Sequence, residues 1–281
     1  MKAVVNPPQI SILLPVYNTG QYLAECLESI CRQTFVYFEV IAVDDGSSDN
    51  SLEILLEYSR KDPRIKVFRN ETNRGVCYSL NHALKKATAG LVARVDSDDV
   101  IMDDRLAKQY AYFQTHPDCL VLGGQVQYIN EQGAITGQSA FPLEDAKIKG
   151  NFFNFQAIAD PTVMINRQLI PEQLLFFDEK LPLAEGLDLY FRLERYGLFA
   201  NLADVIVLYR QRAGSLVTTD LKRTFYYIHQ VRRTAVREYG IKAPLGSELI
   251  SFCQKIAVAI LPFQLLIRIH DWVKRLLIKV A

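Results

Sequence analysis

The sequence predicts an α/β fold in which a mainly parallel sheet is flanked by helices, with a helical extension at the C-terminus. In the first hundred residues, short apolar runs alternate with amphipathic segments of helical period. The apolar runs are too hydrophobic to face water on one side, which is typical of parallel strands covered on both faces. Less regular apolar runs between residues 106 and 210 predict an extension of the same domain with mixed strand directions.

Four strands and three helices are expected in strict alternation before residue 100. The strands are 10–16, 38–43, 65–68 and 91–95, and the helices are 22–34, 51–61 and 73–87. Helices of about three turns between short strands fit right-handed crossover connections within one sheet. Beyond this region, strands are expected near 119–129, 161–165 and 201–210, and an amphipathic helix is expected at 186–197.

The net charge of +1 conceals an uneven distribution of charge along the chain. From Lys222 onward there are eleven basic and three acidic side chains, whereas the preceding 221 residues carry 21 basic and 28 acidic ones. An acidic body with a basic tail indicates two parts with different tasks. We therefore expect a main domain over residues 1–220 and a basic amphipathic helical extension over residues 221–281.

The cysteine content indicates a reducing compartment. The five cysteines, at positions 26, 31, 77, 119 and 253, form neither a CxxC pair nor a zinc-type cluster. An odd, unpatterned set predicts reduced thiols, most of them buried as small hydrophobic side chains. The N-terminal segment "MKAVVNPPQ" has no apolar stretch of the signal-peptide type, so we expect a cytoplasmic protein.

Polar clusters follow each of the first four predicted strands. They are "PVYN" at 15–18, "DDGS" at 44–47, "NETNRG" at 70–75 and "DSDD" at 96–99. In a parallel sheet the carboxyl ends of the strands lie along one edge, where open α/β sheets bind ligands. Each cluster alone also fits a solvated turn or a helix cap. Their occurrence after four strands in succession favours a shared binding site.

The chemistry of these side chains suits a nucleoside diphosphate. Asp96, Asp98 and Asp99 repel one another unless a cation lies between them, and carboxylates are the hard oxygen ligands that Mg²⁺ and Mn²⁺ prefer. Tyr17 offers a stacking surface, and Asp45 offers an acceptor for a base N–H. No GxGxxG or other glycine-rich loop follows the first strand, which argues against a dehydrogenase or a nucleotidyltransferase.

The motifs "SILLPVYN", "FEVIAVDDGSSDNS", "NRGVCYSLNHAL" and "ARVDSDD", all within residues 9–110, closely resemble those of the family 2 glycosyltransferases, which have the GT-A fold. Similar pieces continue to about residue 215. The resemblance implies a sheet of the GT-A type and an inverting, Mn²⁺- or Mg²⁺-dependent transfer of a sugar. The donor would be a nucleotide-sugar, most often a UDP-sugar. The acceptor would be a glycan or lipid-linked hydroxyl in the synthesis of surface polysaccharide or lipopolysaccharide.

The resemblance also implies roles for particular residues. Residues 1–220 would form the nucleotide-sugar-binding and catalytic domain. Asp98, together with Asp96, would bind the metal. The nucleotide-binding residues would be Pro15, Val16, Tyr17, Asn18, Asp44, Asp45, Arg74, Arg94, Asp96 and Ser97.

The catalytic half departs from the family pattern. The family usually places its base in a Glu-Asp pair before a helix, whereas this chain reads "AEGLDLYFRL", with Gly186 at the base position. Glu185 or Asp188 would then be the catalytic base; alternatively, another carboxylate such as Asp160 serves, or the protein binds nucleotide-sugar without turnover. Asp160 and Arg212 each replace a histidine that is frequent in the family.

The C-terminal segment leaves two alternatives open. Its longest charge-free stretch, 256–267, has twelve residues and contains Pro262, which is too short to span a bilayer. Further along, apolar positions share one helical face and basic positions share the opposite one: Leu266, Ile269, Val273, Leu276, Leu277 and Val280 against Arg268, Arg275 and Lys279. Such a helix either lies on an anionic membrane surface or packs on the domain or a partner subunit. No nucleic-acid-binding module is present, so no nucleic-acid partner is expected.

Overall fold

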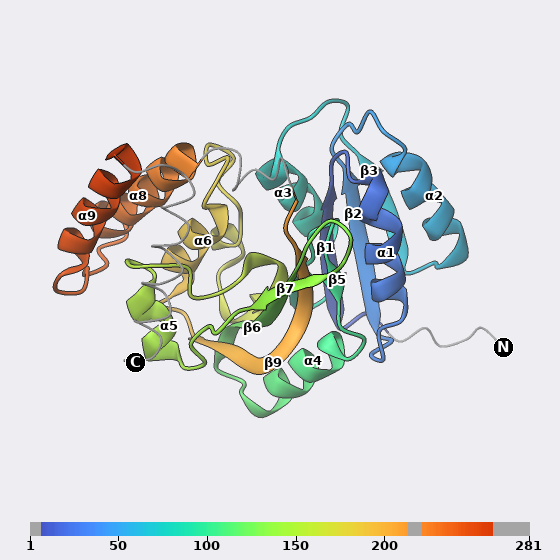
Figure 1. The fold of residues 1–281 in the computed structure, drawn as a ribbon. Helices are drawn as coiled ribbons and strands as arrows, with labels where there is room; N and C mark the ends of the chain where they lie inside the picture. The colour runs from blue at the N-terminus through green and yellow to red at the C-terminus, as the bar shows by residue number, and fades with distance from the viewer. Residues whose placement is uncertain (1–6, 213–220, 261–281) are drawn as a thin grey trace.

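A mixed sheet of nine strands runs through the computed structural model, which describes residues 7–212 and 221–260 (Figure 1). The strands are β1 (Ile10–Val16), β2 (Phe38–Asp44), β3 (Ile65–Arg69), β4 (Leu91–Arg94), β5 (Val100–Ile101), β6 (Cys119–Ile129), β7 (Ile135–Gln138), β8 (Met164–Asn166) and β9 (Leu198–Arg210). The α-helices are α1 (Gly20–Cys31), α2 (Ser51–Lys61), α3 (Val76–Lys86), α4 (Arg105–Thr115), α5 (Asp145–Asn151), α6 (Glu185–Leu193), α8 (Leu221–Arg237) and α9 (Ser247–Ile260). Three short 3₁₀ helices are η1 (Asp160–Thr162), η2 (Arg167–Leu169) and η3 (Glu172–Leu174).

The first four strands are parallel and adjacent in the order β3-β2-β1-β4, as the alternating pattern predicts. Successive residues of these strands enter two different cores. Ile12 and Leu14 of β1 belong to the core that contains α1 and α2, whereas Leu13 belongs to the core that contains α3. Because both faces are covered, β1 and β2 are buried at every position, and this explains their unbroken hydrophobic runs.

The second half of the sheet has mixed strand directions, which confirms the expectation for residues 106–210. Strand β8 pairs antiparallel with both β4 and β6, and β9 runs parallel to β6 before its far end pairs with the short β5. The long strand β9 therefore brings its C-terminal residue, Arg210, back to the loop that follows β4. This return delivers basic side chains to the acidic edge of the sheet.

The C-terminal helices α8 and α9 lie at the end of the molecule opposite α1 and α2 (Figure 1). Helix α8 packs on α6, and its residues Val231 and Ala235 are buried in the core that contains Phe191. The guanidinium of Arg232 also donates from Nε to the carbonyl of Phe152 at 3.1 Å. Helix α8, at the start of the predicted extension, thus packs on the main domain.

The predicted amphipathic face between residues 266 and 280 lies outside the described residues. Within the described part of the chain, no helix is both long and apolar enough to cross a membrane. The division of the chain at residue 220 stays a prediction.

A buried hydrogen bond attaches the segment after α8 to α6. The Tyr239 hydroxyl donates to Asp188 Oδ1 at 2.8 Å, and Arg192 Nε donates to Asp188 Oδ2 at 2.9 Å. Asp188 is only 2% exposed, so its two oxygens depend on these protein donors instead of water. Helix α6 and the C-terminal helices are therefore linked through one carboxylate.

We expect Tyr239→Phe to lower the free energy of unfolding by about 1–3 kcal/mol, because it leaves a buried carboxylate oxygen without a donor. Urea denaturation followed by circular dichroism measures the change. Tyr226→Phe is the matched control, since Tyr226 is 65% exposed on α8. Equal stability of the two variants would contradict the anchoring role of the bond.

Candidate active site

The site lies along the carboxyl edge of the four parallel strands, where the strand order reverses beside β1. The strand register aligns these ends: Val16 pairs with Asp44, and Asp44 pairs with Arg69. On the other side of β1, Leu13 pairs with Arg94. The four polar clusters predicted from the sequence are therefore neighbours.

Asp45 holds together the loops that follow β2 and β3. Its carboxylate is 3% exposed and accepts hydrogen bonds from Asn70 Nδ2 at 2.7 Å and from the backbone N–H groups of Arg74 and Gly75 at 2.9 and 2.8 Å. Gly75 has a φ of 89°, a conformation that favours glycine. The exposed guanidinium of Arg74 lies 4.2 Å from the ring centroid of Tyr78.

The turn after β1 presents one aromatic ring to solvent. Pro15 and Val16 are buried within the strand, whereas Tyr17 is 45% exposed. Asn18 has a positive φ of 49°, and its N–H donates to Ser47 Oγ at 3.1 Å. Tyr17 thus has the exposure that stacking on a nucleobase requires, and Asn18 and Ser47 join its turn to the next loop.

Two predicted nucleotide-binding residues are buried in the walls of the site. Asp44 is fully buried, accepts from the Ser47 N–H at 3.2 Å and lies 3.1 Å from Arg69 Nε. Ser97 is 5% exposed, and its hydroxyl lies 2.9 Å from that of Thr19. Both residues fix the conformation of the loops in this structure.

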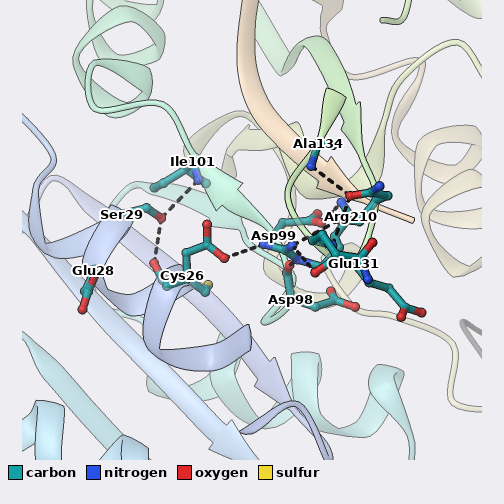
Figure 2. Close-up of polar contacts among 12 residues, drawn as sticks. Cys26, Glu28, Ser29, Asp98, Asp99, Ile101, Glu131, Ala134 and Arg210 are labelled. Carbon is teal, nitrogen blue, oxygen red and sulfur yellow. Dashed lines mark hydrogen bonds and ion pairs between the residues drawn. The ribbon is translucent and has the colours of Figure 1, made fainter. Parts of the chain in front are cut away.

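Arginines from distant segments surround the acidic loop that follows β4. Asp99 Oδ1 accepts from the backbone N–H of Arg210 at 2.8 Å, and Arg210 Nε donates to the Asp98 carbonyl at 2.9 Å (Figure 2). Arg105 of α4 is fully buried and donates to the Arg94 carbonyl at 2.9 Å. Burial, reinforced by the neighbouring carboxylates, raises the pKa of Asp99 well above its usual range. Nothing in the sequence distinguishes Arg105 or Arg210, because only the return of α4 and β9 to the sheet brings them to this loop.

The two predicted metal ligands, Asp98 and Asp96, are partly exposed, and each forms an ion pair with an arginine. The Asp98 side chain is 18% exposed, and its Oδ2 lies 2.6 Å from Arg212 Nε. The Asp96 side chain is 26% exposed, and its Oδ1 lies 2.9 Å from Arg94 Nε. Burial and the nearby Asp96 raise the pKa of Asp98, so these carboxylates are crowded despite their arginine partners.

This donor set fits a divalent cation that takes its remaining ligands from substrate and water. Mg²⁺ is commonly held by only one or two protein carboxylates together with phosphate oxygens. Over residues 7–212 and 221–260, no group of three acidic, histidine or cysteine side chains could hold a metal by itself. Arg212, which stands where the resemblance to the family implies a histidine, places a cation beside Asp98.

Arg94 joins the acidic loop after β4 to helix α6. Its side chain is 11% exposed; Nε lies 2.9 Å from Asp96 Oδ1, and the other end of the guanidinium lies 2.9 Å from Glu185 Oε1. Glu185 is thereby brought to the acidic loop. Asp188, the second predicted base, instead faces Arg192 and the segment after α8.

A further carboxylate, Asp160 of η1, lies beside the same helix. Its Oδ1 accepts from the Tyr190 hydroxyl at 2.6 Å. Burial raises the pKa of Asp160 to about 6, with an opposing effect from Arg94 and an added one from Glu185. The sequence indicates Asp160 only as an alternative base. What points to it there is that positions 160 and 186 both depart from the family pattern.

Comparisons with known proteins identify the family. Residues 11–172 match the model described as Glycosyl transferase family 2. The chain is 32% identical over 224 residues to glycosyltransferase GlyG of Streptococcus pneumoniae serotype 4, which covers 75% of this chain and 73% of that protein. It is 38% identical over 127 residues to the putative glycosyltransferase EpsE of Bacillus subtilis, which covers 45% of this chain and 46% of that protein.

Solved structures show the same fold. Residues 1–349 of S. aureus TarS in complex with UDP align with a TM-score of 0.65 and 25% identity, over 86% of this chain and 69% of that one. The mannosyltransferase PcManGT from Pyrobaculum calidifontis, in complex with GDP-Man and Mn²⁺, aligns with a TM-score of 0.65 and 17% identity, over 95% of this chain and 81% of that one. The curled mixed sheet with its flanking helices is thus of the GT-A type, and this chain belongs to the family 2 glycosyltransferases.

Proposed function

We propose that the protein transfers a sugar, with inversion, from a nucleotide-sugar to a hydroxyl of a glycan or lipid-linked acceptor. The observation that carries this proposal is the Asp96–Arg94–Glu185 chain, which connects the acidic loop of the donor edge to the helix beside the reacting centre. UDP is the proposed nucleotide, since S. aureus TarS was solved with UDP and with UDP-GlcNAc.

In the proposed donor site, the loops joined by Asp45 hold the nucleoside. Tyr17 stacks on the base, and Arg74 lies at the mouth of the pocket. The remaining proposed nucleotide-binding residues shape the turns or face the diphosphate: Pro15, Val16, Asn18, Asp44, Arg94, Asp96 and Ser97. The support for this assignment is their common position at one edge of the sheet.

In the proposed metal site, Asp98 and Asp96 would hold Mn²⁺ or Mg²⁺. When bound, such an ion neutralises the charge that develops on the leaving diphosphate. Arg212 Nε lies 2.6 Å from Asp98 Oδ2, and we propose that its guanidinium also faces the diphosphate of the bound donor. A guanidinium beside the diphosphate would add to the same charge stabilisation.

Inverting transfer also needs a carboxylate that accepts the proton of the acceptor hydroxyl. Glu185 is the candidate from the sequence, and its ion pair supports a second role in positioning Arg94 beside Asp96. The contacts of Asp188 with Arg192 and Tyr239 support a structural role. A second candidate function, binding of nucleotide-sugar without turnover, is favoured only by Gly186 at the usual base position.

We propose surface polysaccharide or lipopolysaccharide as the context, with the enzyme peripheral on the cytoplasmic face of the membrane. The described end of the chain supports this proposal. On α9, Leu249, Phe252 and Ile256 fall on one helical face and are 66%, 59% and 43% exposed. Apolar side chains on a helix, followed by basic residues, suit contact with an anionic bilayer surface.

We expect Asp45→Asn to weaken UDP binding about 10- to 100-fold. The carboxylate of Asp45 accepts from Asn70 and from the backbone N–H groups of Arg74 and Gly75, and an amide, which has a single accepting oxygen, cannot accept from all three. Isothermal calorimetry with UDP and Mn²⁺ measures the affinity. Glu57→Gln on α2 is the control, since the Glu57 side chain is 58% exposed and pairs only with Lys61 in the contacts described. Unchanged UDP affinity in Asp45→Asn would argue against the proposed nucleoside pocket.

Asp98→Ala should abolish metal-dependent UDP binding and lower turnover by roughly 100-fold or more, since a metal ion contributes several kcal/mol of charge stabilisation. Chelation with EDTA should have the same effect on the wild type, and Mn²⁺ should reverse it. Asp103→Ala is the matched control, because the Asp103 side chain is 59% exposed and pairs with Arg32. Wild-type turnover in Asp98→Ala, or in EDTA, would exclude the proposed metal role.

Full-length protein should sediment with vesicles that contain anionic phospholipid and stay in solution with neutral vesicles. Deletion of residues 261–281 should reduce the bound fraction, because it removes the predicted basic amphipathic face. Thermal denaturation of the shortened chain checks that the domain stays folded. Equal vesicle binding with and without residues 261–281 would refute membrane contact through this segment.

A further inference from the structure

The carboxylate of Asp160 occupies space that a side chain at position 186 would need. A Cβ atom added to Gly186 would lie 2.1 Å from Asp160 Oδ1 and 2.7 Å from its Cγ. Carbon and oxygen atoms that are not bonded cannot approach so closely, so position 186 admits only glycine while Asp160 keeps this conformation. The family's usual base would begin at that Cβ. The two departures at 160 and 186 are thus coupled in space, because the Asp160 carboxylate lies where a side chain at 186 would begin.

The surroundings of Asp160 suit a proton acceptor. The groups that act on it through charge or hydrogen bonding are Arg94 from β4, Asp96 from the following loop, and Glu185 and Tyr190 from α6. Asp160 is partly exposed, and its hydrogen-bond donor in the described contacts is the neutral Tyr190 hydroxyl, at 2.6 Å. Burial raises the pKa of Asp160 to about 6, so its carboxylate is ionised near pH 7 and more basic than an ordinary aspartate.

Glu185 is less suited to this role. Its Oε1 accepts from Arg94 at 2.9 Å, and its side chain is only 9% exposed. Proton transfer to Glu185 would break the ion pair and leave the buried Arg94 with one carboxylate partner. Asp160 can accept a proton without the loss of that pair.

We propose that Asp160 is the general base of the transfer. The inference rests on the proposed function and assigns its proton acceptor. An Asp160 oxygen takes the proton of the acceptor hydroxyl while the hydroxyl oxygen forms a bond to the anomeric carbon of the donor sugar. The bond from that carbon to the diphosphate oxygen breaks, and the nucleoside diphosphate leaves with the electron pair. Tyr190 and Arg94 are positioning residues for this carboxylate.

The first test compares Asp160→Asn with Glu185→Gln, both of which keep the side-chain shape. UDP release is followed with UDP-N-acetylglucosamine, UDP-glucose and UDP-galactose in the presence of Mn²⁺, with a mixture of oligosaccharides and a membrane lipid extract as acceptors. Asp160→Asn should lower the turnover number by about 100-fold or more, with UDP affinity within about twofold of the wild type. Turnover in Asp160→Asn within about threefold of the wild type, or a larger loss in Glu185→Gln at unchanged UDP affinity, would overturn the assignment.

An exchange variant tests the placement of the carboxylate. Asp160→Gly alone should be as inactive as Asp160→Asn. The double variant D160G/G186D should turn over at least about tenfold faster than Asp160→Gly, because it supplies a carboxylate to the same region from α6. Thermal denaturation and UDP affinity are measured on each variant. A double variant that is folded and binds UDP but is no more active than Asp160→Gly would contradict the proposal.

The dependence of turnover on pH gives a readout that a purely structural role would not move. Turnover of the wild type should fall as the pH drops through about 6, because the base must be ionised. The Tyr190 hydrogen bond lowers the pKa of Asp160. Tyr190→Phe should therefore shift the acidic limb to higher pH, and an unshifted limb would argue against Asp160.

The activity of the wild type distinguishes failure of the proposed function from failure of the Asp160 assignment. A wild-type protein that binds UDP with Mn²⁺ but releases none from any of the three donors would refute the transferase proposal, and the assignment of Asp160 with it. An active wild type together with an active Asp160→Asn would refute the assignment of Asp160 alone.

Discussion

The buried guanidinium of Arg94 is the interaction on which the arrangement of the site depends. A buried cation is stable only when it is paired, and Arg94 has two carboxylate partners from segments far apart in sequence, Asp96 and Glu185. The pairing fixes the acidic loop after β4 relative to the start of α6. Because β4 sits between β1 and β8 in the sheet, Arg94 also lies at the junction between the parallel half and the mixed half. The acidic loop and helix α6 are therefore held together by charge as well as by packing.

The acidic loop illustrates how a fold tolerates crowded carboxylates. Asp96, Asp98 and Asp99 are each approached by an arginine or an arginine backbone N–H, from β4, from the segment after β9 and from β9 itself. This compensation is incomplete: burial and mutual repulsion still raise the pKa values of Asp98 and Asp99. Such a loop gains stability from an added cation, and this is a physical reason for a metal-assisted donor site at this edge.

The pair Asp160 and Gly186 shows that two positions far apart in the sequence can depend on each other through the space that they share. Judged by position in the sequence, the catalytic half has lost its base. Judged by position in space, a carboxylate fills the volume that a side chain at 186 would occupy. Asp188 shows the opposite case: it matches a family position in the sequence, but both of its oxygens are bound by Arg192 and Tyr239.

The sequence by itself determined the parallel half of the sheet. Strands buried on both faces have unbroken apolar runs, and the helices between them have apolar residues at helical spacing. It also determined which polar clusters meet, because parallel strands end at one edge. It could not determine the partners of these side chains. The contacts of Arg94 with Glu185, of Arg212 with Asp98 and of Tyr190 with Asp160 depend on where η1, α6 and β9 return to the sheet. Such long-range contacts leave no periodic pattern in the sequence, so only the tertiary structure decided which partners these carboxylates have.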